Sequence, residues 1–231
     1  GFIWYQGQYH LFYQCFPYAP QWGRMHWGHA VSKDLVNWEE KGIALYPTKT
    51  DDRSGCFSGS AVEQDGTMYL YYTGVNYLEE DPENINHCRN DQFLSAQMMI
   101  SSADGMTFDN LQEKKTIIPT IAEDKIGSKT HTRDPKVWRG TDAWYMVLGS
   151  SVAHKGRLLI YQSRDLQNWK YLSHVEKDNF GWMWECPDYF EVDGKGITVF
   201  SPMAFLNDGK AYDSAAICLF STFDEATGTM Q

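Results

Sequence analysis

Three segments of this chain share one pattern, and an internal repeat constrains the fold more than any single motif does. The segments are SKDLVNW from Ser32, SADGMTF from Ser102 and SRDLQNW from Ser163. In each, an aspartate lies two positions after the serine, and an aromatic residue follows four positions later. These serine and aspartate side chains are expected to bond nearby backbone groups, as they do in tight turns.

Each repeated turn follows a strand-like run, and a second, aromatic run lies further upstream. A unit of about 50–75 residues with four strands is typical of one blade of a β-propeller. A fourth, partial unit starts at Gly194, so the sequence predicts an all-β chain with about four blades. The segment Glu79–Asp91 is the least strand-like part and is expected to be a polar loop.

The composition argues against several classes of function. A net charge of −10 disfavours partners such as nucleic acids and anionic membrane surfaces. The five cysteines include no CxxC pair, which argues against zinc and redox motifs. Unpaired thiols favour a reducing compartment, so a cytoplasmic location is predicted. No run is apolar enough to span a membrane, and the oligomeric state is left open.

The first strand of each propeller blade lines the central channel, so residues at the start of these strands should meet at one mouth. The start of each first strand should lie about ten residues before the aromatic second strand, and about twelve residues before it in the fourth unit. The segments found there are Phe57–Ser60, Arg133–Pro135 and Glu185–Asp188. Asp134 and Glu185 are thus expected at equivalent places, and each following proline should force its predecessor toward extended geometry.

Two carboxylates that converge on one pocket repel each other, which raises the pKa of at least one of them. Trp182 and Trp184, beside Glu185, would add desolvation. A carboxylic acid that stays protonated near neutral pH can serve as a general acid. The alternative is a structural ring of charges at the channel mouth, and the spacing leaves both interpretations open.

At these residues the chain resembles glycoside hydrolase family 32, which contains invertases, sucrose-6-phosphate hydrolases, inulinases and levanases. YHLFYQCFPYAPQWGRMHWGHAVSKDLVNWE resembles the family's first blade, and CFSGSAV, RDPKVW and WECPDYF resemble its further signatures in the same order. The resemblance implies a five-bladed β-propeller, of which this chain would cover about four blades, without the family's C-terminal β-sandwich. Residues 1–231 are therefore expected to be a partial catalytic domain, truncated at both ends.

The resemblance also implies roles for individual residues. Glu185 matches the acid/base of a retaining β-fructofuranosidase, and Asp134 matches the residue that binds fructosyl hydroxyls and stabilises the oxocarbenium-like transition state. Arg133 would contact the sugar or hold the carboxylates in a salt bridge. The fructose-pocket positions of the family are matched by Gln14, Trp22, Phe57 and Ser58. No metal and no cofactor are expected, because two carboxylates perform both protonation and attack.

The family nucleophile is the aspartate of an Asn-Asp-Pro-Asn-Gly motif, and Gly1 resembles the last glycine of that motif. The nucleophile is therefore expected upstream of Gly1. The prediction that follows is that these 231 residues alone do not hydrolyse sucrose.

Sucrose or sucrose 6-phosphate is the expected substrate. The alternatives are a fructan hydrolase acting on inulin or levan, a related five-bladed arabinosidase or xylosidase, and a non-catalytic sugar-binding propeller. An arabinosidase or xylosidase would lack the HWGHAVSKDLVNW and ECPD blocks. A phosphate would require cationic or imidazole side chains, and the possible contributors are His10, Arg24, His26, His131 and Lys136.

Overall fold

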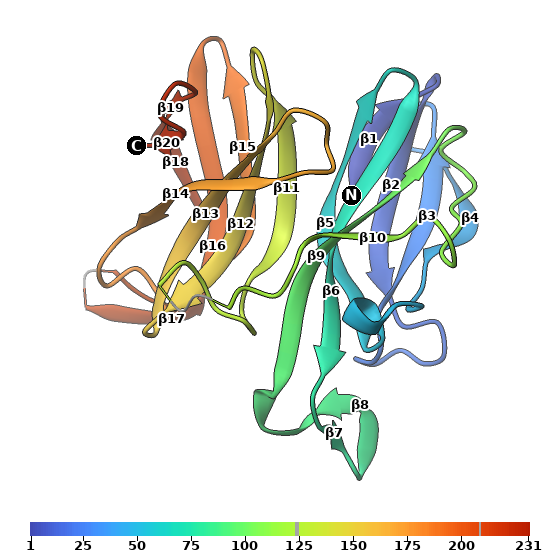
Figure 1. Cartoon of the computed structure of the whole chain (residues 1–231), viewed down its shortest axis with the longest axis horizontal. Coiled ribbons are helices and arrows are strands. Elements are labelled where there is room, and N and C mark those ends of the chain that lie inside the picture. Colours follow the sequence, from blue (N-terminus) through green and yellow to red (C-terminus); the bar gives the residue numbers. More distant parts are fainter. Residues whose placement is uncertain (123–124, 208) are drawn as a thin grey trace. The chain divides into compact units, whose positions relative to one another are not determined.

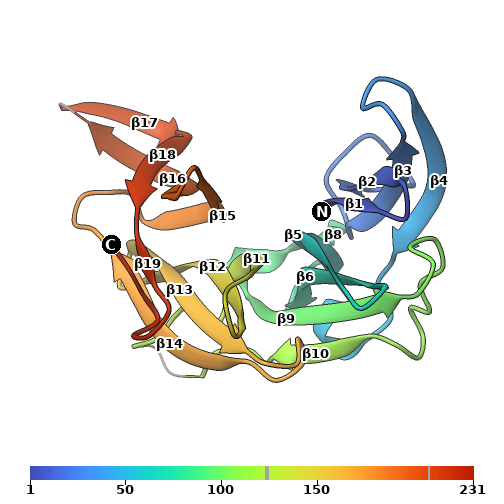
Figure 2. The same cartoon turned by 90° about the horizontal axis from the view of Figure 1, so that it is seen from above.

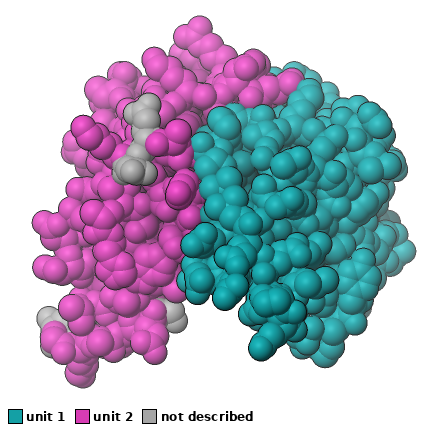
Figure 3. Space-filling view, turned by 60° about the horizontal axis from the view of Figure 1, so that its bottom comes forward, with its two compact units in different colours: residues 1–120 teal, residues 121–231 magenta. Residues whose placement is uncertain are grey.

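The computed structural model describes residues 1–122, 125–207 and 209–231. The chain forms two compact units, residues 1–120 and 121–231, which Figure 3 distinguishes by colour. Each unit contains two antiparallel four-stranded sheets and is described here by itself. In the described part, the helical elements are two short 3-10 turns, η1 (Thr50–Asp52) and η2 (Arg89–Asp91).

In the first unit, both main sheets follow chain order from their first strand to their last (Figure 1). The first sheet consists of β1 (Phe2–Tyr5), β2 (Gln8–Cys15), β3 (His26–Ser32) and β4 (Trp38–Leu45). The second consists of β5 (Gly55–Gln64), β6 (Thr67–Tyr77), β9 (Phe93–Ser102) and β10 (Lys115–Ile118).

Between β6 and β9 the chain forms a separate hairpin of β7 (Glu80–Asp81) and β8 (Asn84–Cys88). The expectation of a polar loop over Glu79–Asp91 was therefore wrong. The side chains are polar and mostly exposed, but the two strands pair through their backbones, for which side-chain burial is not needed.

In the second unit, the third sheet again runs in chain order (Figure 2). It consists of β11 (Arg133–Arg139), β12 (Trp144–Val152), β13 (Lys155–Ser163) and β14 (Lys170–Glu176). The fourth consists of β15 (Met183–Val192), β16 (Lys195–Asn207), β17 (Lys210–Ser214) and β18 (Ile217–Ser221). β17 and β18 both pair with β16, and a last hairpin joins β19 (Phe223–Asp224) to β20 (Thr229–Met230). The prediction of an all-β chain with four four-stranded blades is confirmed.

Two-residue turns fix the register of several of these strand pairs. The turns Gln6-Gly7, Asp65-Gly66 and Asp193-Gly194 join the first and second strands of three blades, and all six residues have positive φ. Such turns match the right-handed twist of the strands they connect. Because the side-chain period of a strand is two, a fixed register also fixes which side chains face the core.

The repeated Ser-x-Asp segments are the turns that the sequence predicts. In the third blade, Asp165 Oδ1 accepts hydrogen bonds from the backbone N–H groups of Gln167 and Asn168, at 3.0 and 2.8 Å. The Asn168 side chain donates to Oδ2 at 2.7 Å. These bonds, first the one from the Asn168 side chain, hold the pKa of Asp165 well below its usual range. Asp34 and Asp104 accept the same pair of backbone bonds in the first two blades.

The core of the first unit contains a fully buried ion pair. Lys114 Nζ lies 2.6 Å from Asp52 Oδ2, and both side chains are 0% exposed. Asp52 also accepts a hydrogen bond from the Tyr72 hydroxyl at 2.8 Å, and Lys114 donates to the carbonyl oxygen of Tyr46 at 2.6 Å. A buried charge without its partner retains its desolvation cost, so removing one member is expensive.

Lys114→Met is therefore expected to lower the free energy of unfolding by about 3 kcal/mol, because it leaves the Asp52 carboxylate buried and uncompensated. Lys115→Met, at the exposed neighbouring position, is the control and should change it by less than about 0.5 kcal/mol. Urea unfolding of both variants measures the difference. Equal losses in the two variants would contradict this account.

A histidine pair is buried between β2 and β3. His10 Nδ1 lies 3.0 Å from His29 Nε2, and the two side chains are 0% and 2% exposed. The His29 ring also stacks on Phe12, with 4.3 Å between the ring centroids. Burial, together with the neighbouring His10 and Lys41, lowers the pKa of His29 from 6.5 to about 4.

The lowered pKa of His29 predicts acid-dependent stability. Below pH 6.5 the unfolded state binds a proton at His29, whereas the folded state binds it only near pH 4. The contribution of His29 to the free energy of unfolding is therefore complete above pH 6.5 and falls as the pH drops from 6.5 to about 4. In His29→Gln the free energy of unfolding should depend less steeply on pH between 6.5 and 4. Urea titrations at several pH values compare the two slopes, and identical slopes would rule the effect out.

Candidate active site

The first strands of the second, third and fourth blades share one irregularity. In β5, β11 and β15 the ladder to the next strand shifts register, so that three steps on the first strand face two on its neighbour. Each shift is a β-bulge, which bends the strand and redirects its side chains. The strand register skips Phe57 and Ser58 in β5, Asp134 and Pro135 in β11, and Cys186 and Pro187 in β15.

The register corrects two expectations. Arg133 and Glu185 are the last paired residues before their bulges, so these two are equivalent, and Asp134 is equivalent to Cys186. The prediction that Asp134 and Glu185 occupy equivalent places was wrong by one residue. Asp134 and Cys186 also have φ of 65° and 48°, and neither is extended. Bulge geometry overrides the usual preference of a residue before proline.

The second unit brings three predicted residues together. Arg133 holds Glu185 through Nη2 at 2.7 Å and Nε at 3.1 Å, and both bonds end on Oε1. The Glu185 side chain is 35% exposed, so its carboxylate is accessible from solvent. Asp134 Oδ2 accepts a hydrogen bond from the Cys186 backbone N–H at 2.8 Å. One carboxylate is therefore oriented by a guanidinium, and the other by a backbone amide of the bulge.

The two carboxylates have different surroundings. Asp134 is 7% exposed, and burial raises its pKa, with a smaller contribution from the charge of Glu185. The Cys186 N–H and the Arg133 charge oppose this rise. The expectation of one raised carboxylate pKa is thus met at Asp134. Trp184, which was expected to desolvate Glu185, instead packs in the core and stacks on Phe200, with 4.4 Å between centroids.

The Cys186 amide is a functional group that the sequence analysis missed. Its hydrogen bond to Asp134 depends on the bulge in β15. The detectable signal was the match of Arg-Asp-Pro with Glu-Cys-Pro, residue for residue, which aligns Asp134 with Cys186. Desolvation of the Cys186 thiol raises its pKa to about 12, so this thiol stays protonated at neutral pH.

The first unit brings together the other four predicted residues in two pairs. Ser58 Oγ donates to Gln14 Oε1 at 3.1 Å. The rings of Trp22 and Phe57 meet edge to face, with 5.3 Å between centroids, and Trp22 remains 45% exposed. The Gln14 amide nitrogen is buried and has no hydrogen-bond partner within the described residues. These side chains therefore offer an exposed aromatic face, with a buried amide group behind it.

A family model, described as the Glycosyl hydrolases family 32 N-terminal domain, matches residues 1–230. The chain belongs to glycosyl hydrolase family 32. Its solved relatives include a GH32 beta-fructofuranosidase of Bombyx mori, with a TM-score of 0.85 and 36% identity over 100% of this chain and 47% of that chain. A mutant of that enzyme in complex with sucrose gives a TM-score of 0.82 and 37% identity over 97% of this chain and 46% of its own.

A curated relative, the sucrose-6-phosphate hydrolase of Zymomonas mobilis subsp. mobilis, is 38% identical over 90% of this chain and 41% of its own length. The sucrose-6-phosphate hydrolase of Bacillus subtilis is 36% identical over 93% of this chain and 43% of its own. The family 32 chain therefore spans about two fifths of the length of these curated relatives.

The side chains that could contribute to a phosphate site have other contacts within each unit. In the first unit of this family 32 chain, His10 is fully buried against His29, and Arg24 pairs with Glu80 at 2.6 Å. His26 is 8% exposed, and its Nδ1 lies 2.8 Å from the carbonyl oxygen of Arg24. In the second unit, Lys136 pairs with Asp188 at 3.0 Å, and His131 Nδ1 lies 3.4 Å from Arg133 Nη1.

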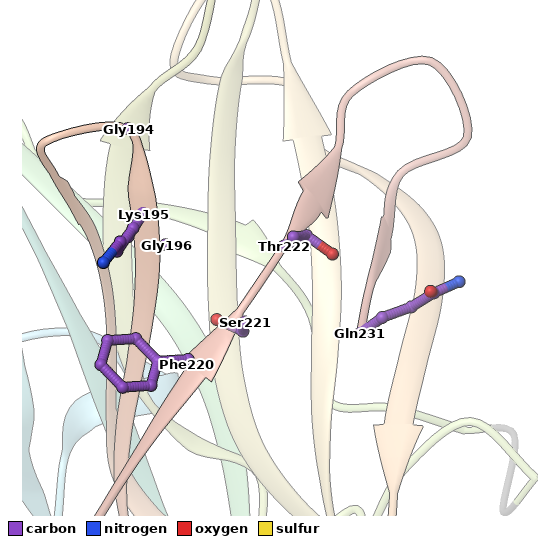
Figure 4. Close-up of a pocket in the computed structure, with 7 residues that line it drawn as sticks. All are labelled: Gly194, Lys195, Gly196, Phe220, Ser221, Thr222 and Gln231. Carbon is purple, nitrogen blue, oxygen red and sulfur yellow. The ribbon is translucent and has the colours of Figure 1, made fainter.

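The predicted site residues do not line the hollow drawn in Figure 4. This cavity of about 360 Å³ lies at the β15–β16 turn and β18, and its walls include Lys195, Phe220 and Gln231. Across residues 1–122, 125–207 and 209–231, no group of three or more His, Cys, Asp or Glu side chains is placed to hold a metal ion. No helix within the described residues has the length and apolarity needed to cross a membrane.

The raised pKa of Asp134 predicts a gain of stability when its charge is removed. Because the folded pKa exceeds the unfolded one, the group destabilises the fold at neutral pH. This destabilisation decreases as the pH falls below the folded pKa, and it is lost only below the unfolded pKa. Asp134→Asn keeps an oxygen that can accept the Cys186 N–H bond, so we expect a higher Tm at pH 7. Asp188→Asn, which removes a half-exposed charge paired with Lys136, is the control and should not raise it. A lower Tm for Asp134→Asn would contradict the conclusion that burial of the Asp134 charge destabilises the fold.

Proposed function

We propose that this chain carries the acid/base and transition-state-stabilising residues of a β-fructofuranosidase that hydrolyses sucrose or sucrose 6-phosphate. The observation that carries the proposal is the pairing of Arg133 with a single oxygen of Glu185, next to the buried carboxylate of Asp134. Membership of family 32 supports it, as do relatives named sucrose-6-phosphate hydrolase and a relative in complex with sucrose.

Glu185 acts as the general acid and base in this proposal. Arg133 holds Oε1, which fixes the orientation of the carboxyl group and leaves Oε2 to exchange a proton with the glycosidic oxygen. The same oxygen then takes a proton from the water that releases fructose. Arg133 thereby acts through Glu185, which favours the salt-bridge role over direct sugar contact.

Asp134 stabilises the transition state. Positive charge develops on the fructosyl ring as the glycosidic bond breaks, and a carboxylate in a desolvated site interacts with it more strongly than in water. Burial raises the pKa of Asp134, and the Cys186 N–H and the Arg133 guanidinium oppose this rise by favouring the ionised form. Burial of Asp134 lowers the stability of the fold, and the same burial strengthens the interaction of its carboxylate with the transition state.

Gln14, Trp22, Phe57 and Ser58 form the fructose-pocket group. Trp22 supplies an exposed aromatic face on which the apolar side of a sugar ring can pack. Ser58 donates to the Gln14 side-chain oxygen and so fixes the orientation of the buried Gln14 amide in this group. The retaining mechanism also requires a carboxylate nucleophile about 5 Å from the acid/base. A cytoplasmic location stays a prediction from the unpaired cysteines.

The test is fructose release from sucrose and from sucrose 6-phosphate by the complete gene product that contains these residues. Glu185→Gln should lower kcat by about 10²–10⁴-fold, the range for loss of a general acid/base. For a fructoside whose leaving group needs no protonation, Glu185→Gln should lower the rate of glycosidic bond cleavage much less. Glu113→Gln, at an exposed position, is the control and should be as active as the parent.

Other outcomes separate the alternatives. Release from inulin or levan but not from sucrose would identify a fructan hydrolase. Binding of fructosides without any release would favour a sugar-binding propeller. A Glu185→Gln variant with full activity on sucrose would overturn the assignment of the acid/base.

A further inference from the structure

The loop that joins β2 to β3, residues 16–25, is fastened to the β7–β8 hairpin. Arg24 Nη2 donates to Glu80 Oε1 at 2.6 Å and lies 3.4 Å from the carbonyl oxygen of Ile85. The charged pair is partly exposed, with 33% and 44% of the two side chains accessible. A guanidinium thus connects two segments that are separated by more than fifty positions in the sequence.

A second connection runs through Tyr77, the last residue of β6. The Tyr77 hydroxyl lies 3.3 Å from the carbonyl oxygen of Asn86 in the hairpin. Burial raises the pKa of Tyr77, and the nearby Trp22 side chain opposes this rise. Tyr77 therefore donates to the hairpin and lies beside the Trp22 side chain. Tyr77 is 3% exposed, which fixes the position of this hydroxyl.

The hairpin itself adds little to the core of the unit. β7 pairs with β8 alone in the described sheets, and Leu78 and Ile85 are 53% and 57% exposed. An isolated two-stranded hairpin is at best marginally stable in water. Residues 79–91, which contain this hairpin, therefore have a use other than filling the core. The hydrogen bond from Arg24 to Glu80 connects them to the loop that carries Trp22, and Tyr77 connects them to the end of β6.

We propose that the β7–β8 hairpin is a positioning element of the fructose pocket: it holds residues 16–25 so that Trp22 keeps its orientation against Phe57. The inference rests on the proposed function, because it takes Trp22 as a wall of that pocket. An aromatic wall contacts the sugar equally in the ground state and the transition state. Disturbing it should therefore raise KM and leave kcat nearly unchanged.

The first test is a charge substitution in the complete gene product. Glu80→Gln removes the ion pair and keeps the shape of the side chain, and it should raise the KM for sucrose about two- to fivefold, as expected for a partly exposed pair. The kcat should stay within about twofold. The double variant Arg24→Glu, Glu80→Arg restores an ion pair of opposite polarity and should recover most of the lost affinity.

Glu79→Gln is a matched control. Glu79 is the next residue along the chain, is 48% exposed, and pairs at 2.8 Å with Arg89, which lies in the same hairpin. This pair stabilises the hairpin internally and does not reach residues 16–25. Its loss should leave KM unchanged, whereas a purely structural role of the hairpin would make Glu79→Gln and Glu80→Gln equivalent.

A stronger test removes the hairpin. Leu78 N already donates to the carbonyl oxygen of Gln92 at 2.8 Å, so an Asn-Gly turn can replace residues 79–91 without disturbing β6 or β9. The KM for sucrose should rise about tenfold or more. A lower Tm with an unchanged KM would show that the hairpin only stabilises the fold, and would overturn the proposal.

The emission of Trp22 gives a readout that does not need activity. The spectrum of each protein minus that of its Trp22→Phe counterpart isolates this residue, and acrylamide should quench it more strongly when the hairpin is replaced. If the parent protein releases no fructose, the proposed function fails, and this quenching still decides whether the hairpin positions Trp22. Equal quenching of Trp22 with and without the hairpin would overturn the positioning role.

Discussion

The bulges in β5, β11 and β15 are the constraint on which the candidate site depends. A regular strand alternates its side chains between two faces, so the side chains of two adjacent residues cannot both point to the same side of the sheet. The extra residue in β11 turns Asp134 out of this alternation, and the one in β15 frees the Cys186 N–H to meet it. Arg133 and Glu185, which directly precede the two bulges, then face each other across neighbouring blades of the second unit. The left-handed backbone at Asp134 and Cys186 is the local cost of this arrangement.

Buried polar groups support the strands at these bulges, by different means in the two units. In the first, the ion pair of Lys114 and Asp52 lies against Cys56, whose sulfur is 3.7 Å from Lys114 Nζ, just before the bulge of β5. In the second, the hydroxyls of Thr132 and Ser150 lie 2.7 Å apart, just before β11. Both arrangements satisfy polar groups in the interior, where an unpaired group would be costly.

The blades could be predicted from the sequence because their signals are local. A Ser-x-Asp turn is complete within a few residues, so its recurrence shows where strands end. The bulges could not be placed in this way, since register depends on the neighbouring strand, and the expected equivalence of Asp134 with Glu185 failed by one residue. Lys114 and Asp52 are 62 positions apart, and nothing in the local pattern of either marks it as buried. The hairpin after β6 was missed because its polarity hid its backbone pairing.

The aspartate turns form their hydrogen bonds within a few residues, and this has a consequence for the evolution of such a chain. Asp224, the last residue of β19, accepts a hydrogen bond from the Ala226 N–H and another from the Thr227 hydroxyl, so a related turn joins β19 to β20. Because each turn satisfies its polar groups from its own few residues, it requires no particular neighbour. A segment bounded by such turns can be copied and joined to another copy without leaving unsatisfied groups at the junction. Gene duplication could then add blades while the divergent first strands acquired separate tasks.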